Sequence, residues 1–388
     1  MKRMMALVLT VAMLTSLFAG CAPVEETPQS ESAAPALQGK QWDYSGMELY
    51  AEDECIVGTE NIMYMDLQDQ LWGNEVLVPG EEITIGFVPK ALENEFWRMT
   101  ADAIEEEIAR MNEAGFKVTV DIRTGQGESD QEGQLAVMLD MVNKGHDIII
   151  AAPISDANLI PGVERAQEAG IPVIPFWVFF RDDPYVDTYM GASSYLEGKL
   201  AAEQFAEHIG SEGGRVAVIT GIASNVITGA RTSGFADYFE NNPDLNIEVV
   251  DIQNGDWDRM KAKDISDTML KAYPDLKGIY CNNDTMALGA LEAVRSADKM
   301  EEVFVGGTDA VSEALTSIAD GELYYTTSNF PHYMAKISLV MAVRTLAGEN
   351  LPENVISPVA GITQENANTP EAEIVGWKEI EWVGEYSN

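Results

Sequence analysis

The apolar positions of the chain follow two alternating spacings from residue 83 onward. Residues 83–89 form a short apolar run, which is typical of a buried strand. The apolar residues that follow, among them Trp97, Ala101 and Ile104, are spaced as on one face of a helix, and Gly115 marks its end. The alternation continues with strands predicted over 116–122, 148–150 and 171–176 and helices predicted over 132–143 and 159–169.

The same alternation begins again near Gly191. It predicts helices over 195–209, 227–239, 259–272 and 284–295 and strands over 215–220, 247–252, 278–281 and 303–305. Short apolar strands that alternate with helices form parallel sheets covered on both faces. The chain is therefore predicted to have an α/β fold with two doubly wound, parallel-sheet domains. Such sheets bind ligands beyond the carboxyl ends of their strands, so two facing sheets would form a cleft.

The first 82 residues differ from this pattern. Residues 1–20 combine a basic start, an apolar run and small residues, which predicts a signal peptide rather than a membrane-spanning helix. Cys21 follows directly in a context that resembles the bacterial lipobox, so we expect a lipid on Cys21; the alternative is a plain signal peptide beside an incidental cysteine. Residues 21–40 have the composition of a flexible tether. Residues 41–82 form an extra aromatic-rich segment, expected to pack on another part of the chain.

The charge balance narrows the classes of partner. The sequence contains 24 Lys and Arg and 64 Asp and Glu residues, a formal net charge of −40 at pH 7, which repels nucleic acids and anionic lipid surfaces. Its three cysteines are too few for a disulfide framework. If Cys21 is lipidated, Cys55 and Cys281 either form a disulfide or remain free thiols.

Catalytic motifs are lacking in the sequence. Its three histidines have no metal-binding spacing, and no phosphate-binding loop, dinucleotide motif or nucleophile elbow occurs. We therefore expect a protein that is not an enzyme and that has no metal site and no cofactor.

Polar and aromatic residues cluster at the predicted strand ends. Planar rings cover the apolar face of a sugar, while carboxylate, amide and guanidinium groups bind its hydroxyls, so this mixture suits a sugar site. The candidate ligand-binding residues are Lys90, Asn94, Phe96, Trp97, Trp177, Arg231, Trp257, Asn283, Asp309 and Asn329.

Several of these residues have a purely structural alternative. Trp97 falls on the apolar stripe of its helix and Trp177 lies in an apolar run, so either could be a core residue. Trp257 could staple a helix start, and Asn283 could be a helix N-cap only. Arg231 lies mid-helix and could be a solvated charge.

Five ordered segments resemble the ribose-binding protein family. They span roughly residues 83 to 365 and are 85–97 (IGFVPKALENEFW), 168–174 (EAGIPVI), 255–259 (GDWDR), 282–290 (NNDTMALGA) and 307–310 (GTDA). The resemblance implies a type I periplasmic-binding fold, with hinge crossovers near 192–194, 328–330 and 360–362. It implies an N-terminal binding domain of residues 83–192 plus 330–359 and a C-terminal one of 193–329 plus 360–388.

The resemblance also implies roles for single residues. Arg231, Asn283 and Asp309 would bind sugar oxygens and Trp257 would stack, while Asn329 stands where the family has Gln. Trp177 replaces a polar residue of the family, which casts doubt on ribose itself and favours a more apolar solute such as a deoxy sugar, a larger glycoside, a polyol or a nucleoside. The calcium loop of the galactose-binding branch is not expected here.

The function predicted from these features is that of an extracytoplasmic, lipid-anchored solute-binding protein of an ABC importer. It would bind a sugar or sugar-like molecule by hinge closure and present it, as a monomer, to a permease. A sensor subunit for a chemoreceptor or histidine kinase, or a binder of a nucleoside, is the alternative. An enzyme is disfavoured because no catalytic residues group together, and a repressor because of the export signal and the lack of a basic helix-turn-helix.

Overall fold

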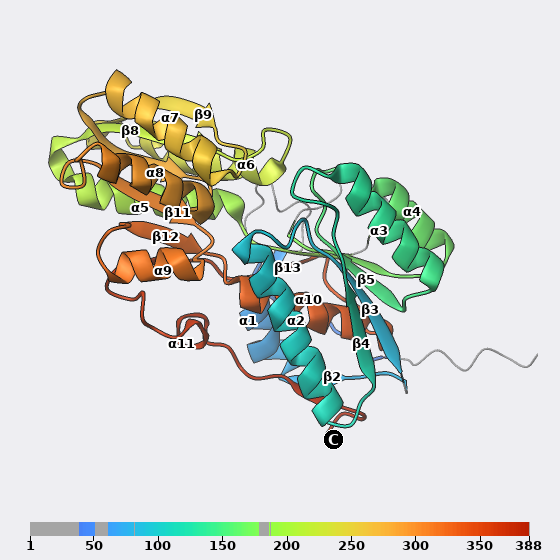
Figure 1. Ribbon diagram of the computed structural model, residues 1–388. Coiled ribbons are helices and arrows are strands. Elements are labelled where there is room, and N and C mark those ends of the chain that lie inside the picture. Colours follow the sequence, from blue (N-terminus) through green and yellow to red (C-terminus); the bar gives the residue numbers. More distant parts are fainter. Residues whose placement is uncertain (1–38, 51–60, 81, 178–185, 187, 388) are drawn as a thin grey trace, which may run out of the picture. The chain divides into compact units, whose positions relative to one another are not determined.

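The computed structural model describes residues 39–50, 61–80, 82–177, 186 and 188–387, and two parallel sheets organise them (Figure 1). The first sheet has the strand order β4-β3-β5-β6. Its strands are β3 (Ile83–Val88), β4 (Val118–Ile122), β5 (Ile148–Ala151) and β6 (Val173–Pro175). Its helices are α2 (Glu95–Glu113), α3 (Gln131–Lys144), α4 (Ile160–Glu168) and α10 (Pro331–Leu346). We call these elements the first lobe.

The side chains of β3 show why helices cover both faces of this sheet. Ile85 and Phe87 point to one face and pack in the same apolar cluster as residues of α2 and α10. Val88 points to the other face and packs with Met138 of α3 and Val163 of α4. Because successive side chains of a strand point to opposite faces, one short apolar strand serves two cores.

The second sheet has the order β14-β12-β11-β10-β8-β9, in which β14 runs antiparallel to β12. Its strands are β8 (Gly214–Thr220), β9 (Ile247–Asn254), β10 (Leu276–Cys281), β11 (Phe304–Thr308), β12 (Tyr325–Ser328) and β14 (Ala360–Ile362). Its helices are α5 (Ser194–Ile209), α6 (Val226–Asn241), α7 (Arg259–Ala272), α8 (Asp284–Ser296) and α9 (Ser312–Ala319), with short 3₁₀ turns at η2 (Gly210–Glu212) and η3 (Pro243–Leu245). We call these elements the second lobe.

The β8 strand again divides two cores. Val216 and Val218 pack with α5 and α6, whereas Ala217 and Ile219 pack with α7 and α8. The two doubly wound parallel sheets predicted from the sequence are confirmed, and so is the position of nearly every predicted helix and strand within two residues.

The segment before the first sheet packs on the first lobe, as its aromatic content predicts. It contains β1 (Asn61–Met63), α1 (Tyr64–Leu67), the π-helical turn η1 (Gln68–Trp72) and β2 (Glu75–Leu77). Strand β1 pairs in parallel with β13 (Asn354–Ile356), which pairs in turn with β7 (Tyr189–Gly191). A bridge between Phe176 and Met190 joins this small sheet to β6.

A buried ion pair anchors the same segment. Arg344 of α10 donates to Glu349 Oε2 at 2.7 Å, and its guanidinium carbon lies 4.8 Å from the ring centroid of Trp72. Trp42 Nε1 donates to the same Glu349 oxygen at 2.6 Å. A buried charge pair that also satisfies an indole N–H is geometrically demanding, so it fixes the position of Trp42 on the first lobe.

The chain crosses between the lobes after β7, after β12 and after β13, close to the three expected hinge positions. It then crosses a fourth time. The tail beyond β14 forms α11 (Glu371–Val375) and β15 (Glu381–Val383), and β15 pairs in parallel with β2. Trp382 Nε1 also donates to Glu107 of α2 at 3.2 Å. The end of the expected 360–388 segment therefore packs with the first lobe and not the second.

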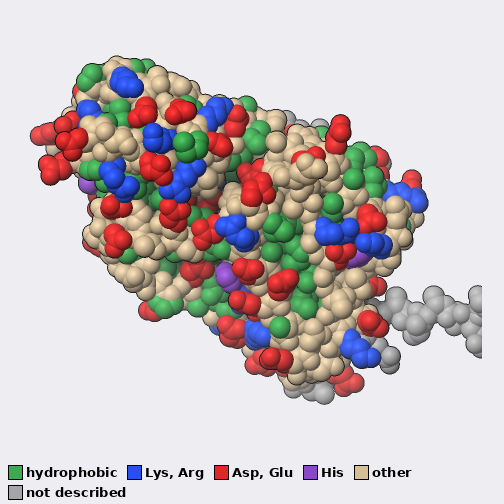
Figure 2. All heavy atoms as spheres, in the orientation of Figure 1, with side chains coloured by type: hydrophobic (Ala, Val, Ile, Leu, Met, Phe, Trp, Pro, Cys, Tyr) green, Lys and Arg blue, Asp and Glu red, His purple; other side chains and the backbone are tan. Residues whose placement is uncertain are grey.

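The surface of the described residues is charged but mixed. On the face shown in Figure 2, acidic side chains are spread over the surface with basic ones among them rather than gathered in one patch. Among the described residues, no helix is both long and apolar enough to cross a membrane. Cys281 is a fully buried free thiol, and burial raises its pKa well above the usual value for a thiol. Cys21 and Cys55 lie outside the described residues.

We predict that Trp42→Ala destabilises the first lobe. The change removes a side chain that is only 9% exposed and leaves buried Glu349 with one donor fewer, so it should lower the free energy of unfolding by about 3 kcal/mol. Denaturant unfolding followed by fluorescence measures this loss. Leu49→Ala, at a site 54% exposed in the same segment, is the control and should change stability by less than about 0.5 kcal/mol. Equal losses in the two variants would show that the segment is not anchored at Trp42.

Candidate functional site

A cavity lies where the carboxyl ends of the strands in the two lobes meet. The space between its lining atoms is about 330 Å³, part of which is open to solvent. Its wall is formed by Lys90, Asn94, Phe96, Trp97, Glu128, Trp177, Ile227, Arg231, Trp257, Asn283 and Asp309.

The structure brings nine of the ten predicted site residues together on this wall. The exception is Asn329, which is fully buried and donates through Nδ2 to Glu197 Oε1 at 3.1 Å. Glu128 and Ile227 also line the cavity and were not predicted. Their presence on the wall follows from their place in the sequence, since each comes after the end of a strand. Glu128 lies in the loop after β4, and Ile227 lies in the first turn of α6.

Glu128 organises the polar part of the first-lobe wall. Asn94 caps α2 by accepting the Phe96 N–H at 3.0 Å, and its amide nitrogen donates to Glu128 Oε1 at 3.0 Å. Trp97 Nε1 donates to the same oxygen at 2.8 Å. Burial raises the pKa of Glu128, and the nearby charge of Lys90 opposes that rise. The Asn94 amide and the Trp97 indole therefore hold this carboxyl group in place through Oε1.

Aromatic rings form the rest of the first-lobe wall. The ring centroid of Phe96 lies 4.9 Å from that of Trp97 and 4.7 Å from that of Trp177. Trp177 is 5% exposed and has a φ of 68°, a left-handed conformation that is costly for a bulky residue. Backbone strain of this kind persists only where the surrounding structure enforces it, and here it directs an indole into the cavity.

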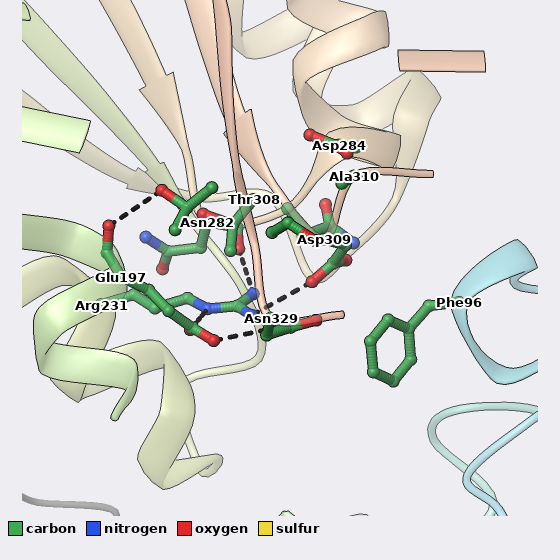
Figure 3. A network of polar contacts seen from close by, with 12 residues as sticks. Phe96, Glu197, Arg231, Asn282, Asp284, Thr308, Asp309, Ala310 and Asn329 are labelled. Atoms are coloured by element: carbon green, nitrogen blue, oxygen red, sulfur yellow. Dashed lines mark hydrogen bonds and ion pairs between the residues drawn. The ribbon is translucent and has the colours of Figure 1, made fainter. Parts of the chain in front are cut away.

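Arg231 is the centre of the second-lobe wall (Figure 3). It is 1% exposed; its Nε donates to Glu197 Oε2 at 2.5 Å and its Nη2 to Asp309 Oδ1 at 3.1 Å. Its Nη1 donates to the carbonyl of Asn282, and its guanidinium carbon lies 5.0 Å from the Trp177 ring centroid. The alternative of a solvated charge is therefore wrong: all three nitrogens bond protein groups, so Arg231 holds the site together.

Asp309 presents its carboxyl group at the edge of this network. In Figure 3 Asp309 and Asn329 lie on the side of the network that faces Phe96. Burial raises the pKa of Asp309 to about 7; Arg231 opposes the rise and Glu197 adds to it. One guanidinium is shared by two buried carboxylates, so neither is fully compensated. A φ of 119° also marks a strained turn at Asp309.

The remaining second-lobe residues are placed by helix starts. Asn283 caps α8 by accepting the Met286 N–H at 3.0 Å, and it also lines the cavity. The Trp257 ring lies so close to Gly221 that a methyl group there would overlap it, and Trp257 has a φ of 64°. Asn283 is thus both an N-cap and a wall residue, so its structural and functional alternatives are compatible.

Three buried polar atoms near the cavity have no hydrogen-bond partner among the described residues: Trp177 Nε1, Asn282 Nδ2 and Asn329 Oδ1. Buried polar atoms without partners cost free energy, which a bound polar molecule or water would recover. In the described part of the chain, no group of three or more His, Cys, Asp or Glu side chains could hold a metal ion. The arrangement is suited to recognition of an uncharged polar molecule with apolar faces.

Comparisons with known proteins agree with this geometry. A family model described as a periplasmic binding protein domain matches residues 85–350. The D-allose-binding periplasmic protein of Escherichia coli (strain K12) is 33% identical over 262 residues, which cover 66% of this chain and 82% of that protein. The ribose import binding protein RbsB of Bacillus subtilis (strain 168) is 29% identical over 284 residues, which cover 73% and 88%.

A solved structure is similar over the same region. It is that of an ABC transporter periplasmic solute binding protein from Actinobacillus succinogenes 130z with bound D-allose. The TM-score is 0.70 at 25% sequence identity, and the match covers 74% of this chain and all of that one.

We predict that Asp309 makes stability fall as the pH rises from about 4 to about 7. Its pKa is about 7 in the folded protein against 3.8 for a free carboxyl group, so between these values the folded protein binds the proton more tightly than the unfolded chain. The stabilisation is complete below about pH 4 and is lost as the pH passes through 7. Arg231, Glu197, Glu128 and Asp284 are the charged groups that surround it.

The difference between the protein and its Asp309→Asn variant isolates this effect from the other carboxyl groups. As the pH is raised from 4 to 8, the melting temperature of the parent protein should fall a few degrees further than that of Asp309→Asn. Parallel curves for the two proteins would show that Asp309 titrates normally.

Proposed function

Because the chain belongs to the periplasmic binding protein domain family, we propose that it is the extracytoplasmic solute-binding component of an ABC importer. We propose further that it binds a sugar or sugar-like small molecule in the cavity between its lobes. The protein binds its ligand without changing it chemically, and binding yields a closed complex that a permease can recognise.

The observation that carries this proposal is the composition of the cavity wall. Phe96, Trp177 and Trp257 offer planar apolar surfaces from both lobes. Asp309 and Asn283 offer a carboxylate and an amide of the kind that exchange hydrogen bonds with vicinal hydroxyls. A sugar ring has apolar C–H faces and a polar rim, so it matches a site with rings on two sides and forked polar groups at its edge.

Two further observations support a small sugar. The similar proteins described above are named for D-allose and ribose, and the similar structure contains D-allose. The space between the lining atoms is at most about 330 Å³, which favours one small molecule over an oligosaccharide. Replacement of a hydrogen-bonding residue by Trp177 favours a ligand whose nearest edge is partly apolar.

Ligand binding would act by closing the two lobes. Asn225 of the second lobe donates to the carbonyl of Ile154 in the first at 3.3 Å, and the Arg231 guanidinium lies over Trp177. Such contacts exist only while the lobes are together, and a ligand that touches both walls adds to them. It would therefore shift the equilibrium between open and closed forms toward the closed form.

We also propose that Cys21, which lies outside the described residues, carries a lipid that holds the protein at the outer side of the cytoplasmic membrane. Support comes from the basic start, apolar run and small residues before this cysteine. We predict that Cys21→Ser moves the protein from the detergent-rich phase to the aqueous phase in a phase-separation assay of cells that express the full chain. A variant that still partitions with detergent would contradict the anchor.

We predict that Asp309→Ala loses ligand affinity without unfolding. A thermal-shift screen of pentoses, hexoses, deoxy sugars, cyclitols, nucleosides and amino acids identifies the ligand, since a compound at 100 times its dissociation constant stabilises by about 2.7 kcal/mol. Titration calorimetry with that compound should show a roughly 10- to 150-fold weaker affinity for the variant, the range for a hydrogen bond to a charged group. Asp264→Ala, at an exposed carboxyl group on α7, is the control.

The screen has two decisive outcomes. Stabilisation by sugars or cyclitols, lost in Asp309→Ala and kept in Asp264→Ala, supports both the ligand class and the site. Stabilisation only by nucleosides or amino acids, or by nothing in the screen, contradicts a sugar-binding function.

A further inference from the structure

A carboxylate of the first lobe contacts a helix start of the second lobe. Glu95 is the first residue of α2, and its Oε1 accepts the backbone N–H of Ser312 at 3.1 Å. Ser312 is the first residue of α9, and 217 positions separate it from Glu95. Glu95 is not part of the cavity wall, although its neighbours Asn94 and Phe96 are.

Helix α9 lacks a side-chain cap from its own segment. The residue at its N-cap position is Val311, whose apolar side chain cannot accept a hydrogen bond, and no side chain of the segment caps the helix. The N–H of Val311 donates to Asp284 Oδ2 at 3.0 Å. The N–H of Ser312 is therefore satisfied by Glu95, so the capping group of this helix comes from the opposite lobe.

The position of Glu95 also favours this contact electrostatically. Its carboxylate belongs to the first turn of α2, where the partial positive charge of a helix N-terminus stabilises an anion. In the contact with Ser312 the same carboxylate reaches a second helix N-terminus. When the lobes separate it stays favourably placed at the start of α2, so it is available to cap α9 again.

We propose that Glu95 is a positioning residue that stabilises the closed form by capping α9 from across the cavity. The proposal rests on the sugar-binding function proposed above, because Glu95 acts on the ligand only through closure. The contact forms whenever the lobes close, with or without a ligand, and during ligand binding it forms after the ligand has entered. Its loss should therefore increase the rate of ligand dissociation and leave the rate of association almost unchanged.

The kinetic test uses the full chain with D-allose as the first probe and, if D-allose does not bind, the strongest ligand of the screen. In Glu95→Ala the dissociation rate constant measured by stopped-flow tryptophan fluorescence should rise roughly 2- to 30-fold, the range expected for loss of a helix cap. The association rate constant should change less than about twofold. Glu95→Gln keeps an acceptor oxygen without the charge, so its dissociation rate constant should lie between those of the parent protein and Glu95→Ala. Glu105→Ala, at an exposed residue of the same helix, is the matched control.

A ligand-free measurement separates the failure of this proposal from the failure of the proposed function. Hydrogen exchange at the Ser312 amide should be faster in Glu95→Ala than in the parent protein and unchanged in Glu105→Ala. Equal exchange in parent and Glu95→Ala would overturn the proposal, and so would faster exchange with an unchanged dissociation rate. If no compound of the screen binds the parent protein, the proposed function fails, while exchange at Ser312 still decides whether Glu95 caps α9.

Discussion

The buried guanidinium of Arg231 is the interaction on which the candidate site depends. Removing a cation from water costs several kcal/mol unless its partners are placed well, and here two carboxylates and a backbone carbonyl surround it. The same group lies over Trp177 of the opposite lobe. Since each partner is itself buried, none can move without leaving a charge uncompensated. Arg231 thus holds Asp309 and the Trp177 ring in the positions from which they face the cavity.

This network extends from the cavity wall to the crossovers between the lobes. Glu197 joins Arg231 to Asn329, which follows directly after β12 at the second crossover. The carbonyl of Asn329 in turn accepts a bond from Ser357, in the segment between β13 and β14. A continuous chain of hydrogen bonds therefore links the Asp309 carboxyl at the cavity wall to two of the three crossovers near the predicted hinge positions. Asn329, which sequence similarity favours as a ligand contact, also connects the wall with the crossovers.

How much of the molecule is predictable from the sequence depends on the range of the interactions involved. The strands around Ile85 and Val216 and the helices between them follow from local periodicity, and residues at the strand ends meet because parallel strands end at one edge. Glu197 could not be recognised among 64 acidic residues, because only its burial beside Arg231 distinguishes it, and the position of Glu128 beyond a strand end is its only signal in the sequence. The return of the tail to β2 has no local signal either, since its strand is three residues long and its partner lies about 300 residues earlier.

The pairing of β15 with β2 has a consequence for biosynthesis. The ribosome delivers Glu75 long before Glu381, and a protein that carries an export signal crosses the membrane in the same order. The second lobe has its full set of strands once Ile362 has emerged, whereas β2, which packs on the first lobe, gains its partner strand only when Glu381–Val383 emerge. Closing such a large loop is entropically slow, so completion of the first lobe should be a late folding step. A chain that lacks Glu381–Val383 would leave the β2 edge unpaired, and an unpaired strand edge is open to pairing with another chain.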